Sequence, residues 1–112
     1  KTRKAAEPWS HKYIFPNAQV PSMADISTAM EKVFVMEDAH NFGAYYDTTL
    51  MAWLEKFEKN WPEISAQYDE RFYRMWRYFL MTNAGAFRGR QLQLWQLVLS
   101  PEGNLGVYDR PY

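Results

Sequence analysis

The sequence contains no cysteine, and its 13 basic and 13 acidic residues leave a formal net charge of zero. The lack of cysteine excludes disulfide bonds, thiolate metal ligands and a cysteine nucleophile, and it fits a reducing compartment. The balanced charge leaves no global field to draw the protein onto nucleic acid or an anionic membrane, so any such binding must be local. Nothing resembles a signal peptide or an apolar run long enough to cross a bilayer, so we expect a cytoplasmic protein.

Several kinds of site also lack their sequence signatures. With two histidines in the chain and no HExxH pattern, Glu37, Asp38 and His40 do not predict a metal site. These three are better interpreted as polar residues at the end of a strand, before the next helix. The segment NAGAFRG (83–89) has neither the preceding strand nor the spacing of a phosphate-binding glycine loop. No serine lies in a motif with a histidine, so a hydrolase triad is unsupported.

Aromatic residues are what the sequence has in excess, since five Trp, eight Tyr and seven Phe make up 18% of the chain. They indicate either an unusually aromatic core or a face that meets something apolar. In RFYRMWRYF (71–79), arginines alternate with aromatics as in single-strand nucleic-acid binders. At helical spacing the aromatics gather on one face, which favours a core stripe. A single-strand nucleic-acid binder remains an alternative, which salt-dependent binding to oligonucleotides would support.

Hydrophobic periodicity predicts an α/β chain of three helices and two strands. The first helix should begin with a capping box formed by Ser22 and Asp25. The second should be capped by Asp47 or a neighbour and should end at Pro62, and the third should begin near Asp69. The predicted helices lie near 22–32, 47–60 and 69–87, and the predicted strands near 33–38 and 91–99.

The two predicted strands are apolar enough to be buried on both faces. Two strands do not make an independently stable sheet without further strands or good helical cover. The chain also begins without Met, in what looks like a connecting arm. We therefore expect a part of a larger α/β domain, with an arm at 1–21 and a turn-rich tail at 101–112.

Several long blocks, in fixed order, carry a resemblance to a known family. From about Trp9 to Ser100 the sequence resembles the C-terminal part of cyclopropane-fatty-acyl-phospholipid synthases, which are related to mycolic acid cyclopropane synthases. One departure is Ala39, where the family's E-D-W-H-N-F-G block usually has Trp. The matching blocks are KYIFPNAQVPS, FVMED with HNFGAYYDTTLMAW, RFYRMWRYFL, AGAFR and QLQLWQLV.

The resemblance implies the C-terminal portion of a Rossmann-like S-adenosylmethionine-dependent methyltransferase, with residues 22–100 in the methyltransferase domain and the two strands antiparallel neighbours. Such enzymes add a methylene across the cis double bond of a phospholipid acyl chain. The cofactor-binding loop and most ligands of the family's active-site bicarbonate would lie upstream, so we expect this chain alone to be inactive and not to bind S-adenosylmethionine. The implied partners are phospholipid acyl chains at the inner face of the membrane, the remainder of the domain and a second copy of the chain, but not nucleic acid.

Tyr46 is the one candidate site residue. From the residues alone, Tyr45 and Tyr46 are more often packing residues than catalytic ones. By resemblance, however, Tyr46 opens the family's Y-x-x-T-L-x-A-W pattern and contacts the bicarbonate. For the whole chain, the alternative to part of such an enzyme is a stand-alone helical interaction domain, which ordered folding as a soluble monomer would support. The residues that complete the pattern are Thr49, Leu50, Ala52 and Trp53.

Overall fold

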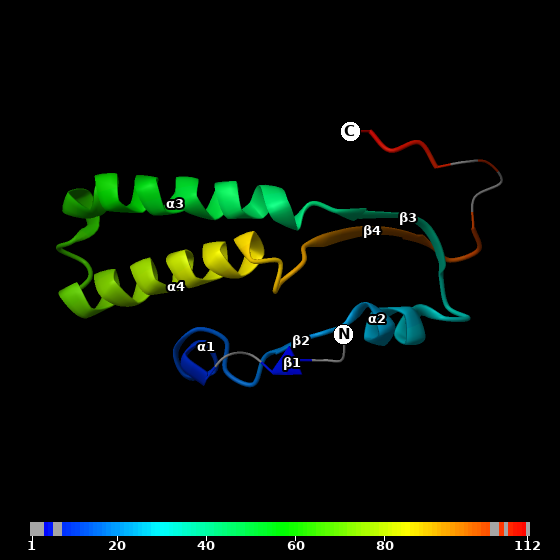
Figure 1. Cartoon of the computed structure of the whole chain (residues 1–112), viewed down its shortest axis with the longest axis horizontal. Helices are drawn as coiled ribbons and strands as arrows, with labels where there is room; N and C mark the ends of the chain where they lie inside the picture. The colour runs from blue at the N-terminus through cyan, green and yellow to red at the C-terminus, as the bar shows by residue number, and fades with distance from the viewer. Residues whose placement is uncertain (1–3, 6–7, 104–105, 107, 112) are drawn as a thin grey trace. The chain divides into compact units, whose positions relative to one another are not determined.

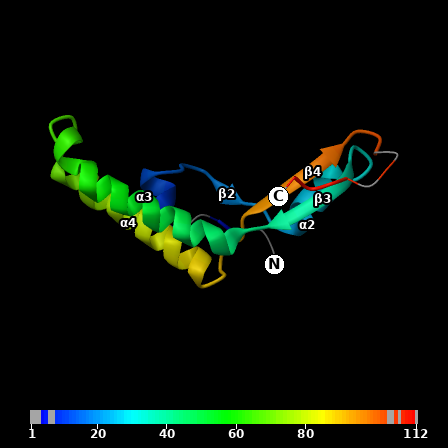
Figure 2. The same ribbon diagram turned by 90° about the horizontal axis from the view of Figure 1, so that it is seen from above.

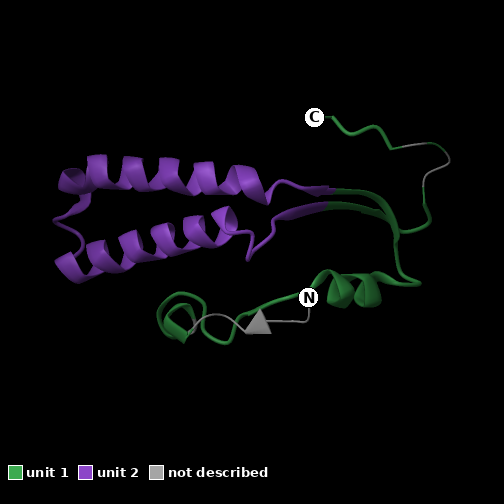
Figure 3. Ribbon diagram, in the orientation of Figure 1, with its two compact units in different colours: residues 1–39, 97–112 green, residues 40–96 purple. Residues whose placement is uncertain are grey.

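The computed structural model describes residues 4–5, 8–103, 106 and 108–111. The rest of the predicted arm and tail lies outside these residues. The described residues form two compact units, residues 1–39 with 97–112 and residues 40–96 (Figure 3). The elements in chain order (Figure 1) are β1 (Lys4–Ala5), α1 (Pro8–Tyr13), β2 (Gln19–Val20), α2 (Met23–Met30), β3 (Val35–Asn41), α3 (Gly43–Ile64), α4 (Glu70–Arg88) and β4 (Trp95–Ser100).

The predicted arm contains more regular structure than its sequence indicates. It holds α1 and the short antiparallel pair of β1 and β2, in which Lys4 lies opposite Val20. Pro8 is the first residue of α1, and Pro16 and Pro21 lie on either side of β2. Prolines at such positions restrict how far regular elements extend. The predicted connecting arm at 1–21 therefore includes short regular elements that its sequence did not indicate.

Helix α2 begins with the predicted capping box. The Ser22 Oγ accepts a hydrogen bond from the Asp25 N–H at 3.1 Å, and the Ser22 N–H donates to the Asp25 carboxylate at 2.9 Å. The helix ends at Met30, two residues earlier than predicted, and Lys32 then takes a left-handed conformation with φ of 66°. The N–H groups of Val33 and Phe34 both donate to the Met30 carbonyl at 3.0 Å, so neither residue joins a strand.

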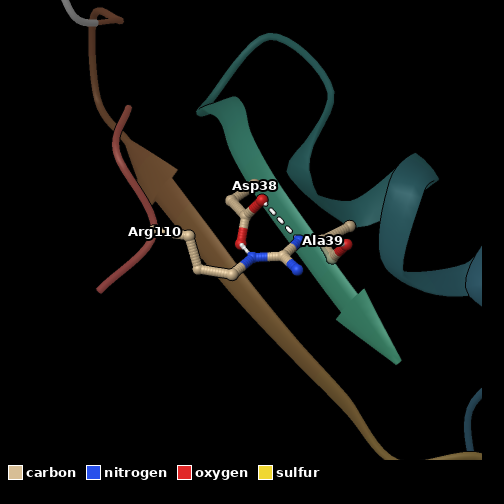
Figure 4. A network of polar contacts seen from close by, with 3 residues as sticks. All are labelled: Asp38, Ala39 and Arg110. Carbon is tan, nitrogen blue, oxygen red and sulfur yellow. Dashed lines mark hydrogen bonds and ion pairs between the residues drawn. The ribbon is translucent and has the colours of Figure 1, made fainter. Parts of the chain in front are cut away.

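Strands β3 and β4 pair in a two-stranded sheet and run antiparallel, as predicted; their arrowheads point in opposite directions in Figure 4. Strand β3 runs on to Asn41, three residues beyond its predicted end near residue 38. Strand β4 begins only at Trp95 because the N–H groups of Gln91 and Leu92 donate to the Ala86 carbonyl, at 2.9 and 3.3 Å. These donors complete the end of α4 instead of a sheet.

The expectation that both strands are buried on both faces is wrong for the described chain. Every residue of β3 and β4 is exposed or half-buried. Their apolar side chains match a sheet with a layer on each face, and the described residues do not bury them.

Helix α3 is longer than predicted at both ends, running from Gly43 to Ile64. It starts four residues before Asp47 because the Asn41 side chain already accepts a hydrogen bond from the Gly43 N–H, at 3.1 Å. Pro62 does not end the helix. It falls in the last turn, where the Ser65 N–H still donates to the Trp61 carbonyl at 2.8 Å and closes the helix.

Helix α4 matches its prediction, and the Asp69 side chain caps it by accepting from the Phe72 N–H at 2.8 Å. Helices α3 and α4 lie side by side as a helical hairpin (Figures 1 and 2). Aromatic contacts continue toward the loop, where the Tyr73 ring lies 5.5 Å from Phe57 and 5.0 Å from Trp61. The hairpin therefore absorbs much of the aromatic excess as packing. Its buried core consists of Leu50, Leu54, Leu80, Ala84 and Phe87.

Candidate functional site

Tyr46 lies in the first turn of α3, half-buried, and packs against the hairpin core. Its ring meets Phe87 edge-to-face at 5.0 Å and Trp53 edge-to-face at 5.8 Å. Edge-to-face contacts at these distances are favourable for aromatic rings, so the ring is held on two sides. No hydrogen bond to the Tyr46 hydroxyl is found within the described part of the chain. The hydroxyl can therefore donate one hydrogen bond to a ligand and can also accept.

The junction between β3 and α3 is fixed by backbone and amide contacts. The Asn41 side chain accepts from the Gly43 N–H at 3.1 Å and donates to the Gln93 Oε1 at 3.0 Å, while the Phe42 N–H donates to the Leu94 carbonyl at 2.9 Å. Gly43 is buried, and a Cβ there would lie 3.0 Å from the Leu94 backbone nitrogen. The glycine therefore permits the close approach that sets where α3 begins.

Asp47, the residue after Tyr46, forms a bidentate ion pair with Arg88. The Arg88 Nε lies 2.8 Å from Asp47 Oδ2, and its second nitrogen lies 3.1 Å from Oδ1. The hydrogen bond to Asp47, with its charge, raises the pKa of Arg88 above its ordinary value. Asp47 was predicted as a possible helix cap, and that prediction is wrong because α3 starts earlier and Arg88 takes the carboxylate.

The rest of the Y-x-x-T-L-x-A-W pattern has mixed surroundings. Leu50 is buried in the core, and Trp53 is half exposed beside Tyr46. The Thr49 hydroxyl donates to the Tyr45 carbonyl at 3.3 Å, and Ala52 is exposed. In this chain the pattern therefore brings Tyr46 and Trp53 together and uses Leu50 to anchor the helix.

The other polar residues singled out from the sequence lie along β3 and are engaged separately. The Glu37 carboxylate accepts from the Ser100 hydroxyl at 2.7 Å, and the His40 ring lies 5.2 Å from Phe42. Asp38 forms a bidentate pair with Arg110, at 2.9 and 2.8 Å, and Arg110 also donates to the Ala39 carbonyl (Figure 4). Across the described residues, no three His, Cys, Asp or Glu side chains gather as metal ligands would.

Arg88, Arg110 and Gln93 were missed by the sequence interpretation. Arg88 lies 41 positions from its partner and Arg110 lies 72. Local patterns detect neighbours three or four residues apart, so no signal in the sequence marks such pairs.

A model of the family described as mycolic acid cyclopropane synthetase matches residues 1–97 of the chain. That family belongs to the S-adenosylmethionine-dependent methyltransferases. The chain is a member of this family, as its resemblance predicted.

Three curated relatives show how the similarity is distributed. The chain is 58% identical over 100 residues to the cyclopropane-fatty-acyl-phospholipid synthase of Escherichia coli, covering 89% of the chain and 26% of that protein. It is 51% identical over 88 residues to the protein of the same name from Citrobacter freundii, covering 77% of the chain and 99% of that sequence. It is 33% identical over 98 residues to the tuberculostearic acid methyltransferase of Mycobacterium tuberculosis, covering 85% of the chain and 23% of that protein. The chain thus spans about a quarter of the E. coli relative.

None of the described helices combines the length and the apolar character that a membrane span needs.

Proposed function

We propose that this chain is the C-terminal part of a cyclopropane fatty acid synthase, which transfers a methylene from S-adenosylmethionine to the cis double bond of an unsaturated phospholipid acyl chain. Membership of the family and 58% identity to the E. coli synthase support this proposal. Because the chain spans 26% of that relative, we expect it to be inactive alone and to work with the remainder of a Rossmann-like methyltransferase domain.

The proposed reaction requires a site that stabilises a carbocation on the acyl chain and holds a base to remove a proton from the new methyl group. S-adenosylmethionine supplies the methyl group when bound, and bicarbonate supplies a base. After the methyl group bonds to one alkene carbon, the other carbon is cationic; loss of a proton from the new methyl then closes the ring. Aromatic faces stabilise nearby positive charge, and a hydroxyl can hold an anionic base in place. Tyr46 and Trp53, whose ring centroids lie 5.8 Å apart, offer this combination.

The residues present fit one contact to such an anion rather than a whole binding site. Tyr46 carries a hydroxyl that makes no hydrogen bond to another described residue, on a ring that packs against Phe87 and Trp53. The cation nearest in sequence to Phe87 is Arg88, which is already paired with Asp47. We infer that Tyr46 donates one hydrogen bond to the bicarbonate, whose other ligands and the cofactor site lie upstream.

The main observation that supports this role for Tyr46 is that its ring is held by aromatic contacts while its hydroxyl makes no hydrogen bond to another described residue. If Tyr46 served only to pack, its contacts with Phe87 and Trp53 would be its whole function, and both would survive in phenylalanine. The two roles therefore differ in what removal of the hydroxyl does.

We also infer the location and partners of the complete enzyme. It would act in the cytoplasm, at the inner face of the membrane, where its phospholipid substrates lie. The uncovered apolar residues of β3 would meet the remainder of the domain or, in this chain alone, a second copy.

The test uses a chimera in which this chain replaces the matching 100 residues of the E. coli synthase. Tyr46→Phe keeps the ring and removes one charge-assisted hydrogen bond, worth on the order of 1.5–3 kcal/mol, so turnover should fall about ten- to a hundredfold. The melting temperature should change little.

Tyr45→Phe is the matched control, because Tyr45 is the adjacent tyrosine and is 71% exposed. It should turn over as the parent does. Near-normal turnover of Tyr46→Phe, with a loss of stability in Tyr46→Ala, would show that Tyr46 only packs. Partial recovery of Tyr46→Phe by added bicarbonate would identify weakened anion binding as the defect.

A further inference from the structure

Two neighbouring residues of α3 contact two neighbouring residues of α4. The Tyr46 ring meets Phe87 at 5.0 Å, and the Asp47 carboxylate meets Arg88 at 2.8 and 3.1 Å. The first contact is apolar and involves the candidate site residue. The second is polar and directional, and it lies immediately beside the first.

The two contacts constrain the helices differently. Apolar core contacts such as Leu50 and Leu80 favour burial but do not select one exact offset between the helices, since burial is non-directional. A bidentate arginine–carboxylate pair has a defined planar geometry, so it selects both the offset and the rotation. The Asp47 side chain is only 16% exposed, so the carboxylate has limited room to move.

The same two helices carry a second ion pair that serves as an internal reference. The Arg77 Nε lies 2.7 Å from the Glu58 Oε1, and the hydrogen bond to Glu58 raises the pKa of Arg77. Glu58 lies eleven residues beyond Asp47, which is about 16 Å along the helix axis. This pair has one hydrogen bond and both of its side chains are more than a third exposed, so like other exposed ion pairs it should contribute little to stability. Only the Asp47–Arg88 pair adjoins Tyr46.

We propose that Asp47 and Arg88 are positioning residues for Tyr46: their bidentate pair fixes the first turn of α3 against the last turn of α4 and thereby sets the direction of the Tyr46 hydroxyl. This inference rests on the proposed function of Tyr46. Neither residue touches the reacting atoms. Their effect arises because catalytic groups displaced by about 1 Å lose rate steeply.

The experiment compares the two ion pairs in the chimera with the E. coli synthase. Arg88→Lys keeps the charge and removes the planar fork, and Asp47→Asn keeps the shape and removes the charge. Each should lower kcat roughly three- to tenfold, with the KM for phospholipid and the melting temperature unchanged. The matched controls, Arg77→Lys and Glu58→Gln, should leave kcat at the parent value.

A second measurement reports the position of the ring without reference to activity. With 3-fluorotyrosine placed at position 46, the fluorine resonance senses the ring of Phe87. Arg88→Lys should shift or broaden this resonance, and Arg77→Lys should leave it unchanged. Equal spectra for the two variants would overturn the proposal.

The final comparison tests whether Arg88 acts through the Tyr46 hydroxyl. In a Tyr46→Phe background, Arg88→Lys should cause no further loss of kcat, because the group it positions is absent. An undiminished loss in that background would overturn the positioning role.

If Tyr46→Phe lowers turnover but Arg88→Lys behaves like Arg77→Lys, the positioning role fails and the function of Tyr46 stands. If Tyr46→Phe is fully active, or the chimera is inactive, the proposed function fails first and this inference fails with it.

Discussion

The α3–α4 hairpin and the β3–β4 strands are equally rich in apolar residues, yet they differ in what they bury. The hairpin closes on its own core, where Leu80 is 1% exposed, whereas no residue of either strand is buried. Two amphipathic helices can cover each other's apolar stripes, but a two-stranded sheet has two faces and two edges to cover. The hairpin is thus complete as a packing unit, and the strands require further layers.

The largest expected effect concerns the uncovered residues that lead into and begin β3. Val33, Phe34 and Val35 are 55%, 42% and 46% exposed. Free strand edges with apolar side chains pair with other chains, so this chain should self-associate, and its sedimentation coefficient should rise with concentration. A charge on the edge opposes such pairing, so Val35→Lys should abolish the rise of the sedimentation coefficient with concentration.

Met51→Lys is the control for that experiment, since Met51 is 39% exposed on α3. It should leave association unchanged. If the chain stays strictly monomeric at high concentration, the uncovered strands do not need further layers, and the contrast with the self-contained hairpin is wrong.

The next effect compares one leucine from each region. Leu80→Ala opens a cavity in the hairpin core and should cost about 2–5 kcal/mol in the free energy of unfolding. Leu97 in β4 is only half-buried, so Leu97→Ala should cost less than Leu80→Ala in this chain. In the chimera, where other layers cover the sheet, the two costs should become similar.

Denaturant unfolding followed by circular dichroism measures both leucine variants. Equal losses in the free energy of unfolding for Leu80→Ala and Leu97→Ala in the isolated chain would contradict the difference in burial between hairpin and strands. A Leu97→Ala cost that stays small in the chimera would show that the sheet gains no cover there.

The smallest effect has opposite signs at two glycines of the hairpin unit. A Cβ at Gly43 would lie 3.0 Å from the Leu94 backbone, so Gly43→Ala should destabilise by about 1–3 kcal/mol. At Gly85 a Cβ meets nothing within 4 Å, so Gly85→Ala should stabilise α4 by about 0.5–1 kcal/mol. Thermal melts give both signs, and destabilisation by both variants would refute the account of Gly43 as a special close approach.

The sequence interpretation succeeded where local rules dominate. The capping box of Ser22 and Asp25 and the start of α4 after Asp69 were both predicted, because a cap needs partners only three residues apart. The order of the five predicted elements was also correct, although β1, α1 and β2 were not predicted. The start of α3 was not, since it depends on the contacts of Asn41 with Gln93 and of Phe42 with Leu94, some 52 residues away in the chain.

The sequence by itself determined the family, the periodic helices and Tyr46 as the candidate site residue, because motifs and periodicity are properties of neighbouring residues. Only the tertiary structure decided that Phe87 packs against the Tyr46 ring, and that Arg88 reaches Asp47 rather than leaving it to cap a helix. The physical reason is that both contacts join residues on two different helices, so they form only when α3 folds onto α4.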